Sequence, residues 1–168
     1  MDNIYSIIGQ LPNELKSCFM AFDNVLLSNI TEIRLRINKP IIIYILDKPY
    51  FISKYDKLIN HYTDSVRYLS GEEFKFILDN ICNNSYHTHI NTMINGYVTD
   101  NYGSRVGIAG EAVYKDSALT SVKNIESINI RISHNIIDCS RNILNTLYLK
   151  SSPSIIIAGP PASGKTTI

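Results

Sequence analysis

Hydrophobic positions in the first part of the chain follow two periods, one typical of helices and one typical of strands. Residues 12–27 repeat apolar side chains every three to four positions, which predicts a helix with one apolar face, and Pro12 suits its first turn. Residues 32–37 alternate strictly between apolar and charged side chains, which predicts a strand with its apolar residues facing a core. The opposite face of that strand carries Glu32, Arg34 and Arg36.

Turn residues divide the following segment into short elements. Polar and proline-containing turns delimit predicted strands at residues 41–46 and 50–52, which indicates an antiparallel meander. The sequence Ser-Gly-Glu-Glu at residues 70–73 matches a helix capping box, and the apolar repeat behind it predicts a helix that ends near residue 83.

Strand-like alternation returns in the second half of the chain. Residues 96–99 and 105–114 predict a hairpin, in which Gly107 and Gly110 indicate bulges or close backbone approach. Residues 127–133 alternate again and predict a further strand, with Arg131 on its polar face. These elements predict an α+β domain of helices and antiparallel strands.

Composition narrows the function classes. The chain has 168 residues, 45% of them hydrophobic, so it is long enough to bury a core. Its net charge of +1 provides no global field for nucleic acid, and we expect no nucleic-acid partner. Three widely separated cysteines are typical of a reducing compartment. No apolar run approaches the roughly 18 residues of a membrane span, so we expect a cytoplasmic protein.

The strongest chemical signal is a phosphate-binding motif near residue 160. The apolar run at residues 155–157 predicts a buried strand, and the pattern G-x-x-x-x-G-K-[ST] follows it directly. In this motif backbone N–H groups surround phosphate oxygens, Lys165 adds a positive charge and Thr166 offers a hydroxyl to Mg²⁺. We therefore expect ATP and Mg²⁺ as cofactors, with Lys165 and Thr166 as catalytic residues. The predicted nucleotide-binding residues are Gly159, Pro160, Pro161, Ala162, Ser163, Gly164, Lys165, Thr166 and Thr167. The simpler alternative is an ordinary Gly/Pro turn between a strand and a helix.

A short polar segment that ends in proline precedes this motif. Residues 138–149 predict a helix, and residues 150–153 mark a boundary behind it. The predicted organisation is an N-terminal α+β domain over residues 1–150, followed by the start of a P-loop ATPase domain over residues 151–168.

Several separated segments together resemble a known family. They are Glu-Ile-Arg-Leu-Arg at residues 32–36 with Pro40 behind it, residues 96–99, residues 105–110, residues 127–132 and the P-loop. In order and spacing they resemble the stage III sporulation protein AA family, which is related to secretion and pilus-motor ATPases. The chain departs from the family pattern at residues 102–105, where paired glycines and a histidine are usual and Tyr-Gly-Ser-Arg stands instead.

The resemblance implies a ring-forming, ATP-binding motor of endospore formation. It implies a RecA-like α/β ATPase core that begins at the P-loop, membrane-embedded channel proteins as partners, and a place beside the membrane in the mother cell. Hydrolysis needs an acidic residue on a later strand and a group that orients water, so we expect the 168-residue chain alone to be inactive. Two alternatives remain: a non-catalytic interaction or oligomerisation module, and a P-loop small-molecule kinase with an N-terminal extension.

Arginines and histidines are the remaining candidate site residues. By analogy with related ATPases, Arg34, Arg36 and Arg105 are candidates for acting on a nucleotide in a neighbouring subunit. The alternative is that these arginines form structural pairs with residues such as Glu32. His87 and His89 have a spacing that suits a metal, but no third ligand is evident, and a polar loop is the preferred interpretation.

Overall fold

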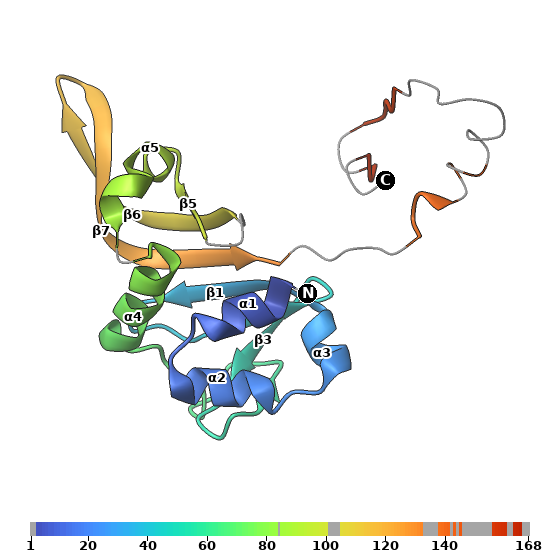
Figure 1. Ribbon diagram of the computed structural model, residues 1–168. Coiled ribbons are helices and arrows are strands. Elements are labelled where there is room, and N and C mark those ends of the chain that lie inside the picture. The colour runs from blue at the N-terminus through green and yellow to red at the C-terminus, as the bar shows by residue number, and fades with distance from the viewer. Residues whose placement is uncertain are drawn as a thin grey trace. The chain divides into compact units, whose positions relative to one another are not determined.

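The computed structural model describes residues 3–83, 85–100, 105–132, 138–141, 143, 145, 156–160 and 163–165 (Figure 1). The chain divides into two compact units, Met1–Ser133 and His134–Ile168. The predicted domain boundary at residues 150 and 151 lies outside the described residues and stays a prediction.

The first unit is built on a seven-stranded sheet in which every neighbouring pair of strands is antiparallel. The strand order is β4-β3-β2-β1-β7-β6-β5. The strands are β1 (Ile30–Arg36), β2 (Ile42–Ile45), β3 (Lys48–Ile52), β4 (Leu58–Ile59), β5 (Tyr97–Thr99), β6 (Arg105–Lys115) and β7 (Ala118–Arg131). The predicted meander is confirmed as β1 to β3. The unpredicted β4 extends it, and pairing of β1 with β7 joins it to the second half of the sheet.

Helices of the first unit are short. They are α1 (Asn3–Gly9), α2 (Asn13–Met20), α3 (Asn24–Ser28), α4 (Gly71–Ile81), the 3₁₀ helix η1 (Tyr86–His89) and α5 (Ile90–Met93). The capping box that starts α4 is confirmed, because Ser70 accepts from the Glu73 N–H while Glu73 accepts from the Ser70 N–H.

The single helix predicted over residues 12–27 is wrong. The chain leaves α2 at Ala21 and begins α3 behind Asp23, whose side chain accepts a hydrogen bond of 2.7 Å from the Leu26 N–H. An aspartate that satisfies an N–H in this way starts a new helix more readily than it continues an old one. The apolar period survives the break, since Leu15, Phe19 and Leu27 are buried.

One core lies between the helices and one face of the sheet. Alternate strand residues such as Ile33, Leu35 and Ile43 join helix residues such as Phe19 and Phe74 in a single cluster of buried side chains. The strand residues between them, including Arg34 and Tyr44, are only half-buried or exposed. The predicted period of two is therefore confirmed, and the sheet has a core face and an open face.

The predicted pairing of residues 96–99 with 105–114 is confirmed as β5 and β6, and β6 also forms a long hairpin with β7 that the sequence does not predict. β6 ends at Lys115, close to the predicted residue 114, but β7 begins at Ala118 and not near residue 127. Residues 118–126 lack strict alternation because almost none of them faces a core: each is exposed or half-buried. Figure 1 shows the end of this hairpin rising beyond the other strands.

Gly110 lies at a bulge in the hairpin, as predicted. The pairing of β6 with β7 shifts between Ala109 and Glu111, and a Cβ atom on Gly110 would lie 2.5 Å from the carbonyl oxygen of Lys123. A Cβ atom on Gly107 would approach Asn129 at an ordinary 3.6 Å. Close backbone approach therefore requires glycine at position 110, but not at position 107.

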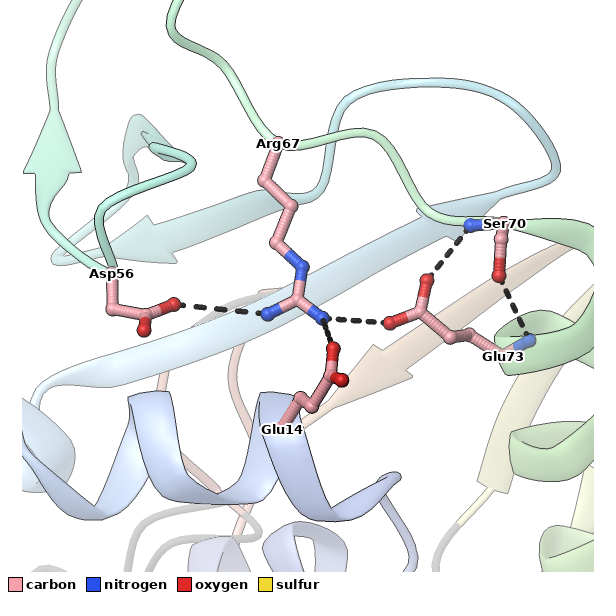
Figure 2. A network of polar contacts seen from close by, with 5 residues as sticks. All are labelled: Glu14, Asp56, Arg67, Ser70 and Glu73. Carbon is pink, nitrogen blue, oxygen red and sulfur yellow. Dashed lines mark hydrogen bonds and ion pairs between the residues drawn. The ribbon is translucent and has the colours of Figure 1, made fainter.

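Arg67 connects three separate elements of the first unit (Figure 2). Its guanidinium donates to Glu73 Oε1 of α4 at 2.7 Å, lies 3.4 Å from Glu14 Oε2 of α2 and lies 3.7 Å from Asp56 Oδ1 in the loop between β3 and β4. Only 15% of the Arg67 side chain is exposed. Although burial works against it, hydrogen bonds from Ser70 and Arg67 lower the pKa of Glu73.

The second unit contains the end of the described chain. Residues 141, 143 and 145 are helical, so the helix predicted over residues 138–149 begins near residue 141. Asp138 forms an ion pair with Arg141 at 2.8 Å. The later part of the predicted helix lies outside the described residues. Ile156 and Ile157 are exposed and are not in a strand, which contradicts the buried strand predicted at residues 155–157. An apolar strand of this kind is stable only beside neighbouring strands and under covering helices. The described residues of this unit include no strand with which it could pair.

Candidate functional site

The described part of the P-loop motif curls around the side chain of its own lysine. Lys165 Nζ donates to the carbonyl oxygens of Gly159 and Pro160 at 2.8 Å and 2.6 Å, and lies 3.4 Å from Ser163 Oγ. Gly164 has a φ of +77°, a conformation that side-chain-bearing residues rarely adopt. A Cβ atom on Gly159 would lie 2.8 Å from Ser163 Oγ. The two glycines thus permit the tight curve of the loop.

This geometry brings together five of the nine predicted nucleotide-binding residues. They are Gly159, Pro160, Ser163, Gly164 and Lys165. Pro161, Ala162, Thr166 and Thr167 lie outside the described residues, and so does the predicted Mg²⁺ ligand among them. What the loop offers chemically is a cationic group at the centre of a bend, partly open to solvent.

The four strand arginines share the open face of the sheet. Strand register places Glu32 opposite Arg131 and Arg34 opposite Asn129. Gly107 of β6 lies opposite the same Asn129, so Arg105, two residues earlier, faces the same way. Alternation in the sequence predicts that each strand has one polar face. Only the pairing of β1 with β7 and of β7 with β6 places these polar faces on the same side of the sheet.

Glu32 divides the arginines into paired and unpaired groups. Arg34 Nε donates to Glu32 Oε1, which raises the pKa of Arg34, and Arg131 Nε lies 3.8 Å from Glu32 Oε2. These contacts are the structural pairs that the sequence offered as an alternative role. Arg36 and Arg105 are exposed and form no ion pair within the described part of the chain.

Two tyrosines add to this face, and the sequence analysis did not identify them. The Arg34 guanidinium lies 4.4 Å from the centre of the Tyr44 ring, and the Arg105 guanidinium lies 5.0 Å from that of Tyr97. Tyr44 of β2 lies opposite Glu32 of β1, and Tyr97 of β5 lies opposite Gly107 of β6. Such stacking restrains each guanidinium over the sheet.

Of the histidine and cysteine candidates for a metal site, the side chain of His87 lies outside the described residues. His89 ends η1, and His61 contacts Asn60 in the loop behind β4. Burial raises the pKa of the Cys82 thiol to about 11, which disfavours the thiolate that a metal requires. Among the described residues, no group of three or more candidate ligands is present. Within the same residues, no helix is long and apolar enough to cross a membrane.

The fold and the loop define a chain in which an antiparallel α+β unit precedes a P-loop sequence motif. The family model described as sporulation stage III, protein AA matches residues 3–168, and the chain belongs to this family. It is 30% identical over 158 residues to stage III sporulation protein AA of Bacillus subtilis (strain 168). The aligned part covers 94% of the chain but 47% of that relative, so the chain spans about half the relative's length. No solved structure matches the chain.

Proposed function

We propose that the chain is the N-terminal part of an ATP-binding motor ATPase of endospore formation. The observation that carries the proposal is the G-x-x-x-x-G-K-T motif, with Lys165 Nζ held within the bend of its loop. Phosphate oxygens can replace the two carbonyl oxygens around the ammonium group, since both are good acceptors for it. Thr166 and Mg²⁺ complete the site in this proposal.

The remaining parts of the proposal concern the whole protein. Family membership supports a role in sporulation at stage III. In the proposal the complete protein has a RecA-like α/β core, forms a homo-oligomeric ring and energises membrane-embedded channel proteins from the cytoplasmic side of the mother cell. The described residues of the second unit include no strand that could carry the acidic residue needed to hold Mg²⁺. In the proposal, ATP hydrolysis therefore depends on the complete protein.

Nucleotide binding by the complete protein tests the proposal. We expect the natural protein, extended beyond Ile168 by its nucleotide domain, to bind ATP, and Lys165→Ala to weaken binding at least about tenfold because one charged contact to phosphate is lost. Isothermal titration calorimetry measures both affinities. Lys48→Ala, an exposed lysine on β3, is the matched control. Equal ATP affinity of the natural and Lys165→Ala proteins would refute the assignment.

The unpaired arginines of the open face extend the proposal. At least one of Arg34, Arg36 and Arg105 acts on a nucleotide held by a neighbouring subunit. Arg36 and Arg105 are the better candidates because Arg34 is engaged by Glu32. Such a group stabilises charge that develops in the transition state, so its loss lowers turnover more than binding.

Alanine substitutions at the three arginines separate these effects. In the complete protein we expect Arg36→Ala or Arg105→Ala to lower the ATPase rate at least about tenfold with ATP affinity little changed. Arg131→Ala is the matched control, because Arg131 lies on the same face and is paired with Glu32. Unchanged turnover in all three variants would remove the arginines from the mechanism while leaving the P-loop proposal intact.

A further inference from the structure

The far end of the β6–β7 hairpin forms an arm without other strands beside it. β1 pairs only with residues 127–131 of β7, and β5 pairs only with residues 105–107 of β6. Residues 111–123, which we call the arm, therefore have two unpaired edges, and their side chains are exposed or half-buried. A two-stranded ribbon is only marginally stable in water by itself. The arm gains stability from any surface that covers it.

The tip of the arm exposes an aromatic ring beside a carboxylate. Tyr114 is 64% exposed, and Leu119, its partner in the ladder, is half-buried. Asp116 and Ser117 make the turn with φ values of 50° and 65°. Asp116 forms no ion pair with any residue that the structure describes. The tip thus combines an apolar anchor with an unpaired negative charge.

A groove of about 560 Å³ lies at the base of the arm. Its apolar lining comes from Leu78 of α4, from Tyr86, Ile90 and Met93 of η1 and α5, and from Val122 and Ile125 of β7. Lys75 and Lys123 also line it, and neither lysine is in an ion pair within the described residues. The groove fits a segment that carries an apolar side chain and a carboxylate.

The arm of the same copy cannot fill this groove. Val122 and Ile125 form one wall, and Tyr114 is paired with Leu119, three residues further along the ribbon from Val122, which is about 10 Å at 3.3 Å per residue. Side chains stand roughly perpendicular to a ribbon, so the Tyr114 ring does not reach back along it into the groove. The chemistry of the tip nevertheless matches the groove: Tyr114 suits an apolar lining that contains the Met93 thioether, and Asp116 suits the lysines. The arm tip of a second copy carries both groups and is the occupant that fits the groove.

We propose that the arm tip of one copy docks in the groove at the base of the arm of a second copy. Tip and groove are different surfaces, so the contact is heterologous and repeats from copy to copy, closing into a ring where the rotation permits. The contact involves neither the P-loop nor the arginine face, and therefore does not depend on nucleotide binding.

Sedimentation of the 168-residue chain without nucleotide tests the contact. We expect the natural chain to associate as its concentration rises. Tyr114→Ala should weaken association about tenfold or more, because aromatic anchors dominate such interfaces. Asp116→Asn, which keeps a residue tolerant of positive φ, should weaken it about threefold and reduce its salt dependence. The matched controls are Tyr55→Ala, a tyrosine 77% exposed, and Asp47→Asn, at a turn with a φ of 64°; neither should alter association.

Mixing two variants tests whether the contact is heterologous. Ile90→Glu blocks the groove but keeps the tip, whereas Tyr114→Ala keeps the groove but loses the tip. Both residues are at least 36% exposed, so we expect both variants to fold, and circular dichroism checks this. At a concentration at which the natural chain associates but a contact weakened about tenfold does not form, each variant alone should be monomeric and an equimolar mixture should form dimers. A natural chain that stays monomeric up to its solubility limit, association unaffected by Tyr114→Ala, or a mixture without dimers would each overturn the proposal.

Discussion

At the scale of single residues, Arg67 forms ion pairs with more groups than any other residue that the structure describes. Three carboxylates from α2, α4 and the β3–β4 loop surround one guanidinium (Figure 2). Without that cation, the carboxylates of Glu14, Asp56 and Glu73 would repel one another near a largely buried position. No local pattern in the sequence points to Arg67, because its partners lie 53, 11 and 6 residues away.

We expect Arg67→Ala to lower the free energy of unfolding by about 2 kcal/mol, because it leaves the half-buried carboxylate of Glu73 without its partner. Arg67→Lys should lose part of the same free energy, since a compact ammonium group lacks the wide, rigid fork with which the guanidinium reaches carboxylates on separate elements. Urea unfolding measures both. Lys57→Ala, an exposed lysine in the same loop as Asp56, serves as control and should change little. A similarly small effect in Arg67→Ala would contradict this role.

The same cluster contributes to pH dependence. The pKa of Glu73 is lower in the folded chain than in the unfolded one, so its contribution is present above the unfolded pKa and is lost as pH falls through the lowered value. Arg67→Ala removes part of this effect. Stability of the variant should therefore fall less steeply with acidification than stability of the natural chain.

At the scale of elements, the β6–β7 hairpin shows how backbone contacts decide which glycines matter. Both Gly107 and Gly110 lie in β6, and the sequence suggested bulges or close approach at each. Only Gly110 lies where the pairing register shifts, against the backbone of residues 123–125. Sequence composition cannot distinguish the two, since the difference arises from the partner strand.

Matched substitutions test this distinction. We expect Gly110→Ala to destabilise the chain by about 2 kcal/mol, because its Cβ would lie 2.5 Å from a carbonyl oxygen and the strands must separate. Gly107→Ala should change stability by less than about 0.5 kcal/mol. Thermal unfolding followed by circular dichroism compares them. Equal losses in the two variants would show that the bulge does not set the requirement for glycine.

Elements that carry a local signal were predicted well from the sequence. The capping box at Ser70 fixed the start of α4, and strict alternation located β1. The prediction was wrong where local and periodic signals compete: the apolar period across residues 12–27 hid the cap at Asp23. β4 and the outer part of β7 were missed because two residues, or a ribbon in solvent, leave no clear alternation.

At the scale of the whole molecule, long-range pairing determined what sequence patterns could not. The P-loop was found from its own spacing, since all its residues are adjacent in the chain. The open arginine face depends on β1 lying between β2 and β7, which no local pattern reveals. Its aromatic partners Tyr44 and Tyr97 come from strands that are not neighbours, and so escaped sequence analysis.

The position of Lys165 in the bend of the loop has a consequence for the proposed binding of a phosphate group. Its ammonium group already has two carbonyl acceptors, so under the proposed function a phosphate group would replace these oxygens and would not meet a bare cation. When the phosphate group dissociates in this proposal, the two carbonyl oxygens again accept hydrogen bonds from the ammonium group. In the proposed function, the attraction between the loop and a phosphate group is therefore offset in part by the loss of the two hydrogen bonds to the carbonyl oxygens.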